Sequence, residues 1–249
     1  MDSSDTLGAL ISAPLIPLRP EQRSERYATE IAHARALHDA DPDDYWAWVA
    51  QQHRWLRPWD TVRTGELGDF RYFDGGLINV ADNCVGRWAE STPDRPAVVW
   101  EGEPGDSRTL TYAELADEVS RLGAGLAALG VQKGDVVAIY MPNLVEAFTA
   151  IHACNRIGAI YTVLFSGFGR DAVASRLAAA RASVVVVADA IYRRGKPMPL
   201  LETLRAARAQ ISDSGTPMLR HTVVVDRTGN GVPLTEGETS YRELVDAHP

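Results

Sequence analysis

The stretch that decides the fold is residues 134–143, which read Gly-Asp-Val-Val-Ala-Ile-Tyr-Met-Pro-Asn. Its centre, 136–140, is a continuous apolar run rich in β-branched side chains, which is typical of a strand covered on both faces. Pro142 and Asn143 end this strand, and Asn143 with Glu146 three residues later predicts a capped helix. Residues at helical spacing predict the buried face of that helix, namely Leu144, Phe148, Ile151 and Cys154.

Gly158 is placed to end the helix that is predicted after Asn143, and the alternation of strand and helix continues beyond it. Further strands are predicted at 160–165, 183–187 and 222–225, and helices at 171–180 and 200–210. Because apolar strands and helices alternate, we assign residues 86–249 to the α/β class, with a mostly parallel sheet and helices on both faces.

Upstream of the decisive stretch, residues 111–130 carry the best-specified helix. Thr111 and Glu114 have the spacing of a capping box, and Gly130 is placed as a C-terminal stop. Gly123-Ala124-Gly125 imitates the start of a dinucleotide-binding fingerprint. We reject that interpretation because these glycines lie inside the predicted helix.

Two places in the sequence carry hairpin signals. Residues 97–100 and 109–111 flank a turn that contains two glycines and a proline. The dipeptide Asn230-Gly231 is a second hairpin signal, and we predict no further role for residues 227–231.

The N-terminal third has a different character. Residues 1–20 lack periodicity and predict a tail, whereas 21–59 show helical spacing. Four of the six tryptophans fall between positions 46 and 59, and such dense aromatic residues usually anchor one element onto another. We therefore predict a helical N-terminal extension over 21–85, packed on the main domain.

Composition excludes several classes of protein. The apolar fraction of 45% and the charged fraction of 23% are ordinary for a globular chain, and 25 basic against 33 acidic residues give a net charge of −8, which disfavours a nucleic-acid surface. The N-terminus has no basic region of a signal peptide, and no apolar run approaches the length of a membrane span, so we expect a cytoplasmic protein without membrane contact. Cys84 and Cys154 have no metal-ligand or disulfide spacing, and we expect both to be buried, reduced thiols.

Two segments are candidate binding sites. Residues 165–169 (Phe-Ser-Gly-Phe-Gly) lie where a strand ends and a helix begins, the edge at which open α/β sheets bind ligands. Residues 189–196 (Asp-Ala-Ile-Tyr-Arg-Arg-Gly-Lys) follow the next strand and place three cations within four positions. We interpret this second segment as a loop that binds a phosphate, with a solvated surface loop as the alternative.

The chain resembles AMP-forming acyl-CoA synthetases of the acetyl-CoA synthetase type. Four motifs in register carry the resemblance, at 72–84, 110–115, 134–143 and 165–168. The resemblance implies an adenylate-forming domain of which this chain is the N-terminal portion, incomplete because the ATP loop and the C-terminal domain should follow Pro249. It implies that the enzyme converts a short-chain carboxylate to acyl-AMP with ATP and Mg²⁺, and then to acyl-CoA.

The resemblance also implies the residues that contact coenzyme A. They are Phe165, Gly167, Arg193, Arg194, Gly195 and Lys196, whereas no catalytic residue and no metal ligand is assigned. Two positions depart from the family pattern, since Ser166 stands where glycine is common and Lys196 where the acetyl enzymes usually have arginine. Because of these departures, a medium-chain or unusual acyl substrate is an alternative to acetate.

Three functions follow as alternatives. The leading one is part of an acetate- or propionate-activating ligase that is inactive by itself, with carboxylate, ATP, CoA and the remainder of its own domain as partners. The second is another adenylate-forming enzyme domain. The third is a non-catalytic module that binds CoA or a nucleotide.

Overall fold

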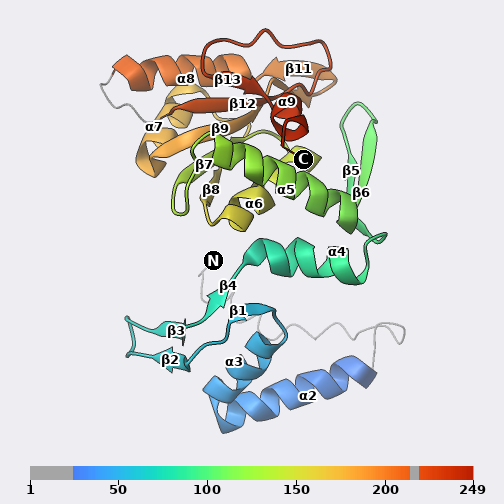
Figure 1. Ribbon diagram of the computed structural model, residues 1–249, viewed down its shortest axis with the longest axis vertical. Coiled ribbons are helices and arrows are strands. Elements are labelled where there is room, and N and C mark those ends of the chain that lie inside the picture. Colours follow the sequence, from blue (N-terminus) through green and yellow to red (C-terminus); the bar gives the residue numbers. More distant parts are fainter. Residues whose placement is uncertain (1–24, 214–218, 249) are drawn as a thin grey trace, which may run out of the picture. The chain divides into compact units, whose positions relative to one another are not determined.

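The computed structural model describes residues 25–213 and 219–248 (Figure 1). The predicted tail, 1–20, lies outside the described residues. The chain divides into two compact units, one formed by Met1–His53 with Trp59–Gly76 and the other by Arg54–Pro58 with Leu77–Pro249. The second unit carries both candidate sites.

The first unit consists of two helices and one antiparallel strand pair. Helices α2 (Glu25–Ala40) and α3 (Pro42–Gln51) are joined at Asp41, whose carboxylate accepts a hydrogen bond from the Asp43 backbone N–H and so caps α3. Strands β2 (Thr61–Thr64) and β3 (Arg71–Asp74) pair beside them. The helices confirm the predicted helical character of this region up to position 51.

The prediction of helix up to position 59 is wrong at its end. Residues Trp55–Arg57 form a short strand, β1, that pairs antiparallel with β4 (Leu77–Ile78) in the second unit. Backbone pairing with a segment 20 residues further along the chain overrides the local helical pattern, because helix propensity is only a weak preference.

The core of the second unit is a five-stranded parallel sheet. Its order is β13-β12-β9-β7-β8, and each neighbouring pair runs parallel. The strands are β7 (Val136–Tyr140), β8 (Ile160–Val163), β9 (Ala182–Ala188), β12 (His221–Val225) and β13 (Glu238–Ser240). This confirms the predicted α/β class. Four consecutive valines of β9, at 184–187, are fully buried at the centre.

Helices cover the sheet in two groups. Helices α5 (Tyr112–Ala128), α6 (Val145–Ile157) and α9 (Tyr241–Asp246) form one group, and α7 (Arg170–Ala180) with α8 (Leu201–Asp213) forms the other (Figure 1). The chain order explains this division. The connection from β7 to β8 crosses the sheet in one direction, and the connection from β8 to β9 crosses it in the other. Because both crossovers are right-handed, α6 and α7 lie on opposite faces.

The helix at 112–128 forms as predicted. Thr111 Oγ1 accepts from the Glu114 backbone N–H and the Glu114 carboxylate accepts from the Thr111 N–H, which completes the capping box. Gly130 follows the helix with a φ of +84°. Gly123 and Gly125 lie within this helix, which confirms that they are not part of a dinucleotide-binding turn.

The predicted cap of α6 is wrong. Leu144 occupies the N-cap position without a side-chain hydrogen bond, and the Glu146 carboxylate instead pairs with Arg108 over 3.0 Å. The predicted buried face is correct at Leu144 and Cys154, but Phe148 is 44% exposed. The buried residues of the helix are Val145, Thr149, Ala150, Ala153 and Cys154.

Smaller elements precede α5 in the second unit. Strands β5 (Pro96–Glu101) and β6 (Ser107–Thr111) form the predicted hairpin. A short π-helical turn (Asp82–Gly86) leads into α4 (Arg87–Ser91), and Cys84 in this turn is exposed, so its predicted burial is wrong. Among the described residues, none of the helices has the length and apolar character that crossing a membrane requires.

Candidate functional site

The first candidate segment forms a tight turn between β8 and α7. The Phe168 backbone N–H donates to the Phe165 carbonyl over 3.0 Å, and the two rings meet edge to face at 5.5 Å between centroids. Gly167 lies beneath the Phe165 ring, since a Cβ at this position would stand 2.5 Å from Phe165 Cε1. The turn therefore presents an aromatic ring, 66% exposed, over bare glycine backbone.

A hydrogen bond from the neighbouring strand β7 fixes this turn to the sheet. The hydroxyl of Tyr140, the last residue of β7, donates to the Phe168 carbonyl over 2.8 Å, and the Tyr140 side chain is fully buried. Burial raises the pKa of Tyr140, so this hydroxyl stays protonated and keeps its donor role. On the outer side, the Arg176 guanidinium lies 4.0 Å from the centre of the Phe168 ring.

The second candidate segment is a β-hairpin, which corrects the predicted loop over 189–196. Strand β10 (Ala190–Arg193) pairs antiparallel with β11 (Lys196–Pro199), and Arg193 stands directly opposite Lys196. The two-residue turn has φ of +54° at Arg194 and +73° at Gly195, the backbone of a type I′ turn. We predicted a loop because the proline-containing β11 gives only a weak strand signal, and proline is tolerated here because the pair forms a separate two-stranded sheet.

The hairpin presents its cations to solvent. Arg193, Arg194 and Lys196 are all exposed, and none of them is ion-paired with a carboxylate among the residues that the structure describes. The Gly195 backbone N–H donates to the Glu103 carboxylate over 2.8 Å. Three exposed cationic residues thus flank the Gly195 backbone donor in sequence at the hairpin turn, a combination suited to an anion.

Asp189 fixes the base of this hairpin. Its carboxylate accepts from the Ala190 N–H, from the Arg227 N–H and from the Thr228 hydroxyl, over 2.8, 2.8 and 2.6 Å. Its carbonyl accepts from the N–H groups of Leu200 and Leu201, where the chain leaves the hairpin. One residue at the carboxyl end of β9 therefore holds both ends of the hairpin and the loop after β12.

Arg227 joins the two hairpins of the second unit, a role that no feature of the sequence had indicated. Its guanidinium lies 5.0 Å from the ring centre of Trp100 in β5 and 5.0 Å from that of Tyr192 in β10. It also forms a two-point ion pair with Asp106, at 2.7 and 3.0 Å, which lowers the pKa of Asp106. Because these partners are far apart in sequence, no local pattern reveals the contact.

The loop that follows Arg227 is not the hairpin turn that Asn230-Gly231 predicted. The Asp226 carboxylate accepts from the N–H groups of Gly229 and Gly231, over 2.9 and 3.0 Å, and folds the loop on itself. The chain then enters β13, which runs parallel to β12. A parallel connection cannot be a tight hairpin.

The sheet brings the two candidate segments to one edge without making them neighbours. Phe165 and Gly167 follow β8, and the hairpin with Arg193 and Lys196 follows β9, so both leave the carboxyl edge of the parallel sheet. Strand β7 lies between β8 and β9. At about 4.8 Å per strand, the backbones of β8 and β9 are separated by about 10 Å, a span that one extended ligand can cover.

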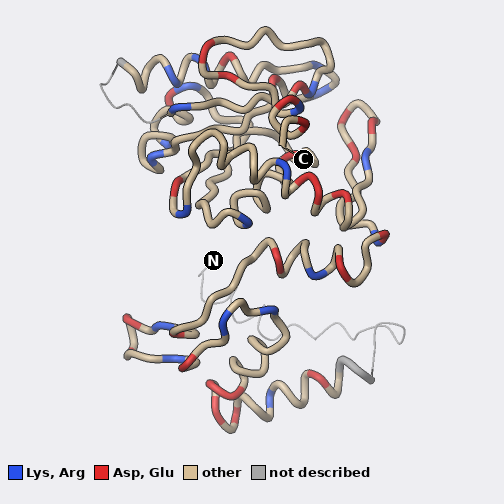
Figure 2. Tube along the Cα trace, viewed as in Figure 1, with Lys and Arg blue, Asp and Glu red and all other residues tan. Residues whose placement is uncertain are grey.

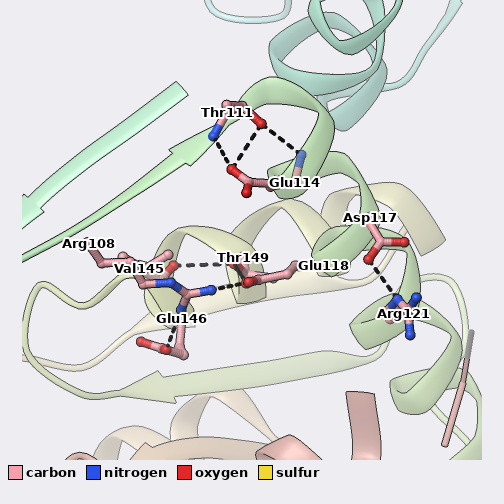
Figure 3. A network of polar contacts seen from close by, with 9 residues as sticks. All are labelled: Arg108, Thr111, Glu114, Asp117, Glu118, Arg121, Val145, Glu146 and Thr149. Atoms are coloured by element: carbon pink, nitrogen blue, oxygen red, sulfur yellow. Dashed lines mark hydrogen bonds and ion pairs between the residues drawn. The ribbon is translucent and has the colours of Figure 1, made fainter. Parts of the chain in front are cut away.

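A polar cluster lies between the hairpin β5–β6 and the helices (Figure 3). Arg108 of β6 pairs with Glu118 of α5 and with Glu146 of α6, and the Thr149 hydroxyl lies 3.3 Å from the Glu118 carboxylate. Burial raises the pKa of Glu118 despite the adjacent Arg108. The same carboxylates line a cavity of about 840 Å³ that reaches Asp226 and Tyr241.

Charges elsewhere are mixed. Figure 2 shows acidic and basic residues interspersed along the traces of both units.

Comparison with known families gives two matches that together cover most of the chain. Residues 85–246 match the family described as AMP-binding enzyme, and residues 32–84 match the family described as acetyl-coenzyme A synthetase N-terminus. The first match alone covers more than half of the 249 residues.

Individual proteins show the same similarity. The chain is 44% identical over 222 residues to the acetyl-coenzyme A synthetase of Streptomyces avermitilis, covering 88% of this chain and 33% of that protein. It is 42% identical over 200 residues to acetyl-coenzyme A synthetase 2 of Pseudomonas putida, covering 79% of this chain and 30% of that protein. The solved acetoacetyl-CoA synthetase from Streptomyces lividans superposes with a TM-score of 0.77 at 27% identity, covering 84% of this chain and 32% of that one. The chain thus spans about a third of the length of these relatives.

Proposed function

Because the chain belongs to the AMP-binding enzyme family, we propose that it forms the CoA-facing part of an enzyme that activates a short-chain carboxylate with ATP and transfers the acyl group to coenzyme A. The match of residues 32–84 to the acetyl-coenzyme A synthetase N-terminus favours acetate-like substrates over other adenylate-forming chemistry. The names of the similar proteins support the same class of reaction.

The proposed reaction has two steps. A carboxylate oxygen attacks the α-phosphorus of ATP, pyrophosphate leaves, and an acyl-AMP forms. The thiol of CoA then attacks the acyl carbon and AMP leaves with the bonding electrons. Activation is needed because a free carboxylate has no good leaving group, whereas AMP is one. Mg²⁺ would accompany ATP and neutralise phosphate charge.

We assign no residue of this chain to Mg²⁺ and none to the bond-making steps. Within the described part of the chain, no three His, Cys, Asp or Glu side chains are grouped so that they could hold a metal ion. The 249 residues also contain no G-x-x-x-x-G-K-[ST] loop. Because the chain spans about a third of the length of its relatives, we propose that it binds CoA by itself without turnover, so that acetate-dependent release of pyrophosphate would contradict the proposal.

The proposed CoA site joins the two candidate segments. Phe165 and Gly167 offer an exposed ring over open backbone, which suits stacking of a planar base. Arg193, Arg194 and Lys196 flank Gly195 in the exposed turn and suit a phosphate. The single observation that carries the proposal is that these cations are exposed and unpaired among the described residues, at the same sheet edge as the turn.

We further propose the domain limits from the sequence, a tail over 1–20, an extension over 21–85 and the adenylate-forming domain over 86–249. The protein is proposed to act in the cytoplasm on small molecules, with neither nucleic acid nor membrane as a partner. The remainder of its own enzyme would supply the contacts to the adenine of ATP and to the carboxylate substrate.

Calorimetry with CoA and with dephospho-CoA, which lacks the 3′-phosphate, tests the site. We expect the wild-type chain to bind CoA more tightly than dephospho-CoA. An Arg193→Ala/Lys196→Ala variant should lose about tenfold in affinity for CoA and keep its affinity for dephospho-CoA. An Arg71→Ala/Arg242→Ala variant removes the same net charge from other exposed positions and should retain the preference. Equal binding of both ligands by the wild type would refute the proposed phosphate site.

A further inference from the structure

An acidic side chain occupies the anion-binding end of the β10–β11 hairpin. The Glu103 carboxylate accepts from the Gly195 backbone N–H over 2.8 Å, although the two residues are 92 positions apart. Both residues are exposed, so burial does not force this contact. The contact places a negative group at the backbone donor whose neighbours in sequence are Arg193, Arg194 and Lys196.

The position of Glu103 is set by the base of its own hairpin. Gly105 N–H donates to the Gly102 carbonyl and closes the turn on which Glu103 lies, and Gly102 N–H donates to the Asp106 carbonyl. Asp106 is in turn paired with Arg227, which stacks on Tyr192 of β10. The tip of one hairpin is therefore held beside the tip of the other, and this arrangement brings the exposed Glu103 side chain to the Gly195 N–H.

A carboxylate and a phosphate compete for the same donors. Each offers negatively charged oxygen acceptors to a backbone N–H and to cationic side chains, but a phosphate monoester carries ≈ −1.5 to −2 charges where the carboxylate carries one. A phosphate that approaches the Gly195 N–H must displace the Glu103 oxygen and tolerate the repulsion of the displaced carboxylate. A ligand without an anionic group at this end does not compete with the carboxylate for the Gly195 N–H.

We propose that Glu103 is an internal competitor that limits the affinity of this site for phosphorylated ligands. In the free protein its carboxylate satisfies the Gly195 N–H, and on binding a phosphate oxygen takes that place while the Glu103 side chain turns to solvent. The identity of the natural ligand as CoA rests on the proposed function, whereas competition with phosphate at Gly195 does not. Removal of the negative charge should therefore strengthen binding of phosphate and leave other ligands unaffected.

The first experiment measures CoA and dephospho-CoA affinities by calorimetry for three forms of the 249-residue chain. Glu103→Gln keeps the size and the acceptor oxygen but removes the charge. Glu101→Gln is the matched control, because Glu101 is exposed on the same hairpin and opposes Ser107. We expect Glu103→Gln to bind CoA about three- to tenfold more tightly, the effect of one unit charge at close range in a solvated site, with unchanged affinity for dephospho-CoA and no effect of Glu101→Gln.

The outcomes separate this inference from the proposed function. If the wild type prefers CoA but Glu103→Gln leaves its affinity unchanged or weakens it, the inference is wrong and the phosphate site stands. If the wild type does not prefer CoA, the proposed function fails, and a second measurement still decides the inference. In that measurement the Gly195 amide resonance is followed by NMR during addition of inorganic phosphate. Glu103→Gln should respond at severalfold lower phosphate than the wild type, and identical titrations would overturn the inference.

Discussion

Gly125 of α5 lies so close to Leu244 of α9 that a Cβ at position 125 would stand 2.6 Å from Leu244 Cγ. Neighbouring Gly123 has more room, because its Cβ would meet Ile157 Cγ2 at 3.4 Å, an ordinary contact. The two glycines of one helix therefore have different structural roles. Only the second permits the close approach of α9, which follows the edge strand β13.

Substitution of these glycines should change stability in opposite directions. Alanine gains about 1 kcal/mol over glycine within a helix, so Gly123→Ala should stabilise the protein by about 0.5–1 kcal/mol. Gly125→Ala should destabilise it by about 1–3 kcal/mol, because overpacking forces α9 away from α5. Urea unfolding of both variants measures the difference. A stabilised Gly125→Ala variant would show that α9 does not pack as described.

Loss of the Tyr140 hydroxyl should loosen the turn of the proposed CoA site. Tyr140→Phe removes the donor to the Phe168 carbonyl and should cost about 1 kcal/mol of stability. We expect faster hydrogen exchange at residues 166–169 with little change in β9. Tyr161→Phe is the control, since Tyr161 is 40% exposed on the edge strand β8. Unchanged exchange in Tyr140→Phe would mean that the turn is held by other contacts.

Removal of the Arg227 side chain should release the β10–β11 hairpin. Arg227→Met loses two cation–π contacts and the pair with Asp106, and cation–π contacts are worth about 0.5–1 kcal/mol each. We expect faster exchange in Ala190–Arg193 and a weaker preference for CoA over dephospho-CoA. The exposed Arg242 supplies the control, Arg242→Met, which should change neither. A CoA preference that survives in Arg227→Met would show that the hairpin keeps its position alone.

Acid should weaken the contact between α8 and β13. Hydrogen bonds from Arg205, at 2.7 and 2.9 Å, hold the pKa of Glu238 below its ordinary value of 4.5. A carboxyl with a lowered folded pKa stabilises the fold above its unfolded pKa, and this contribution is lost as pH falls through the folded value. Wild type should thus be more stable than Glu238→Gln at pH 7, and the difference should shrink below about pH 4.5. A difference that stays constant with pH would assign the effect to packing.

Local sequence patterns predicted the elements whose causes are local. The capping box at Thr111 and Glu114, the stops at Gly130 and Gly158, and the valine run at 184–187 each depend on residues within a few positions. The strand-helix alternation then predicted the parallel sheet, because each crossover has one favoured hand. The cations of 193–196 were also visible as a cluster before the fold was known.

Features that join distant segments were not predictable in the same way. Glu146 pairs with Arg108 instead of the end of its own helix, and 55–57 leave the helical pattern to pair with β4. In each case a partner tens of residues away offers a stronger interaction than the local pattern.

The sequence by itself determined the class of fold and four of the five strands of the sheet, because β13 was not predicted, and it supplied the residues that we propose to bind a phosphate. Only the tertiary structure decided that these residues form the tip of a hairpin, that Arg227 joins this hairpin to β5 through Tyr192 and Trp100, and that Glu103 accepts from its Gly195 N–H. The physical reason is that charge and hydrogen-bonding capacity are properties of single residues. Which donor meets which acceptor depends instead on the distant groups that the fold brings within about 3 Å.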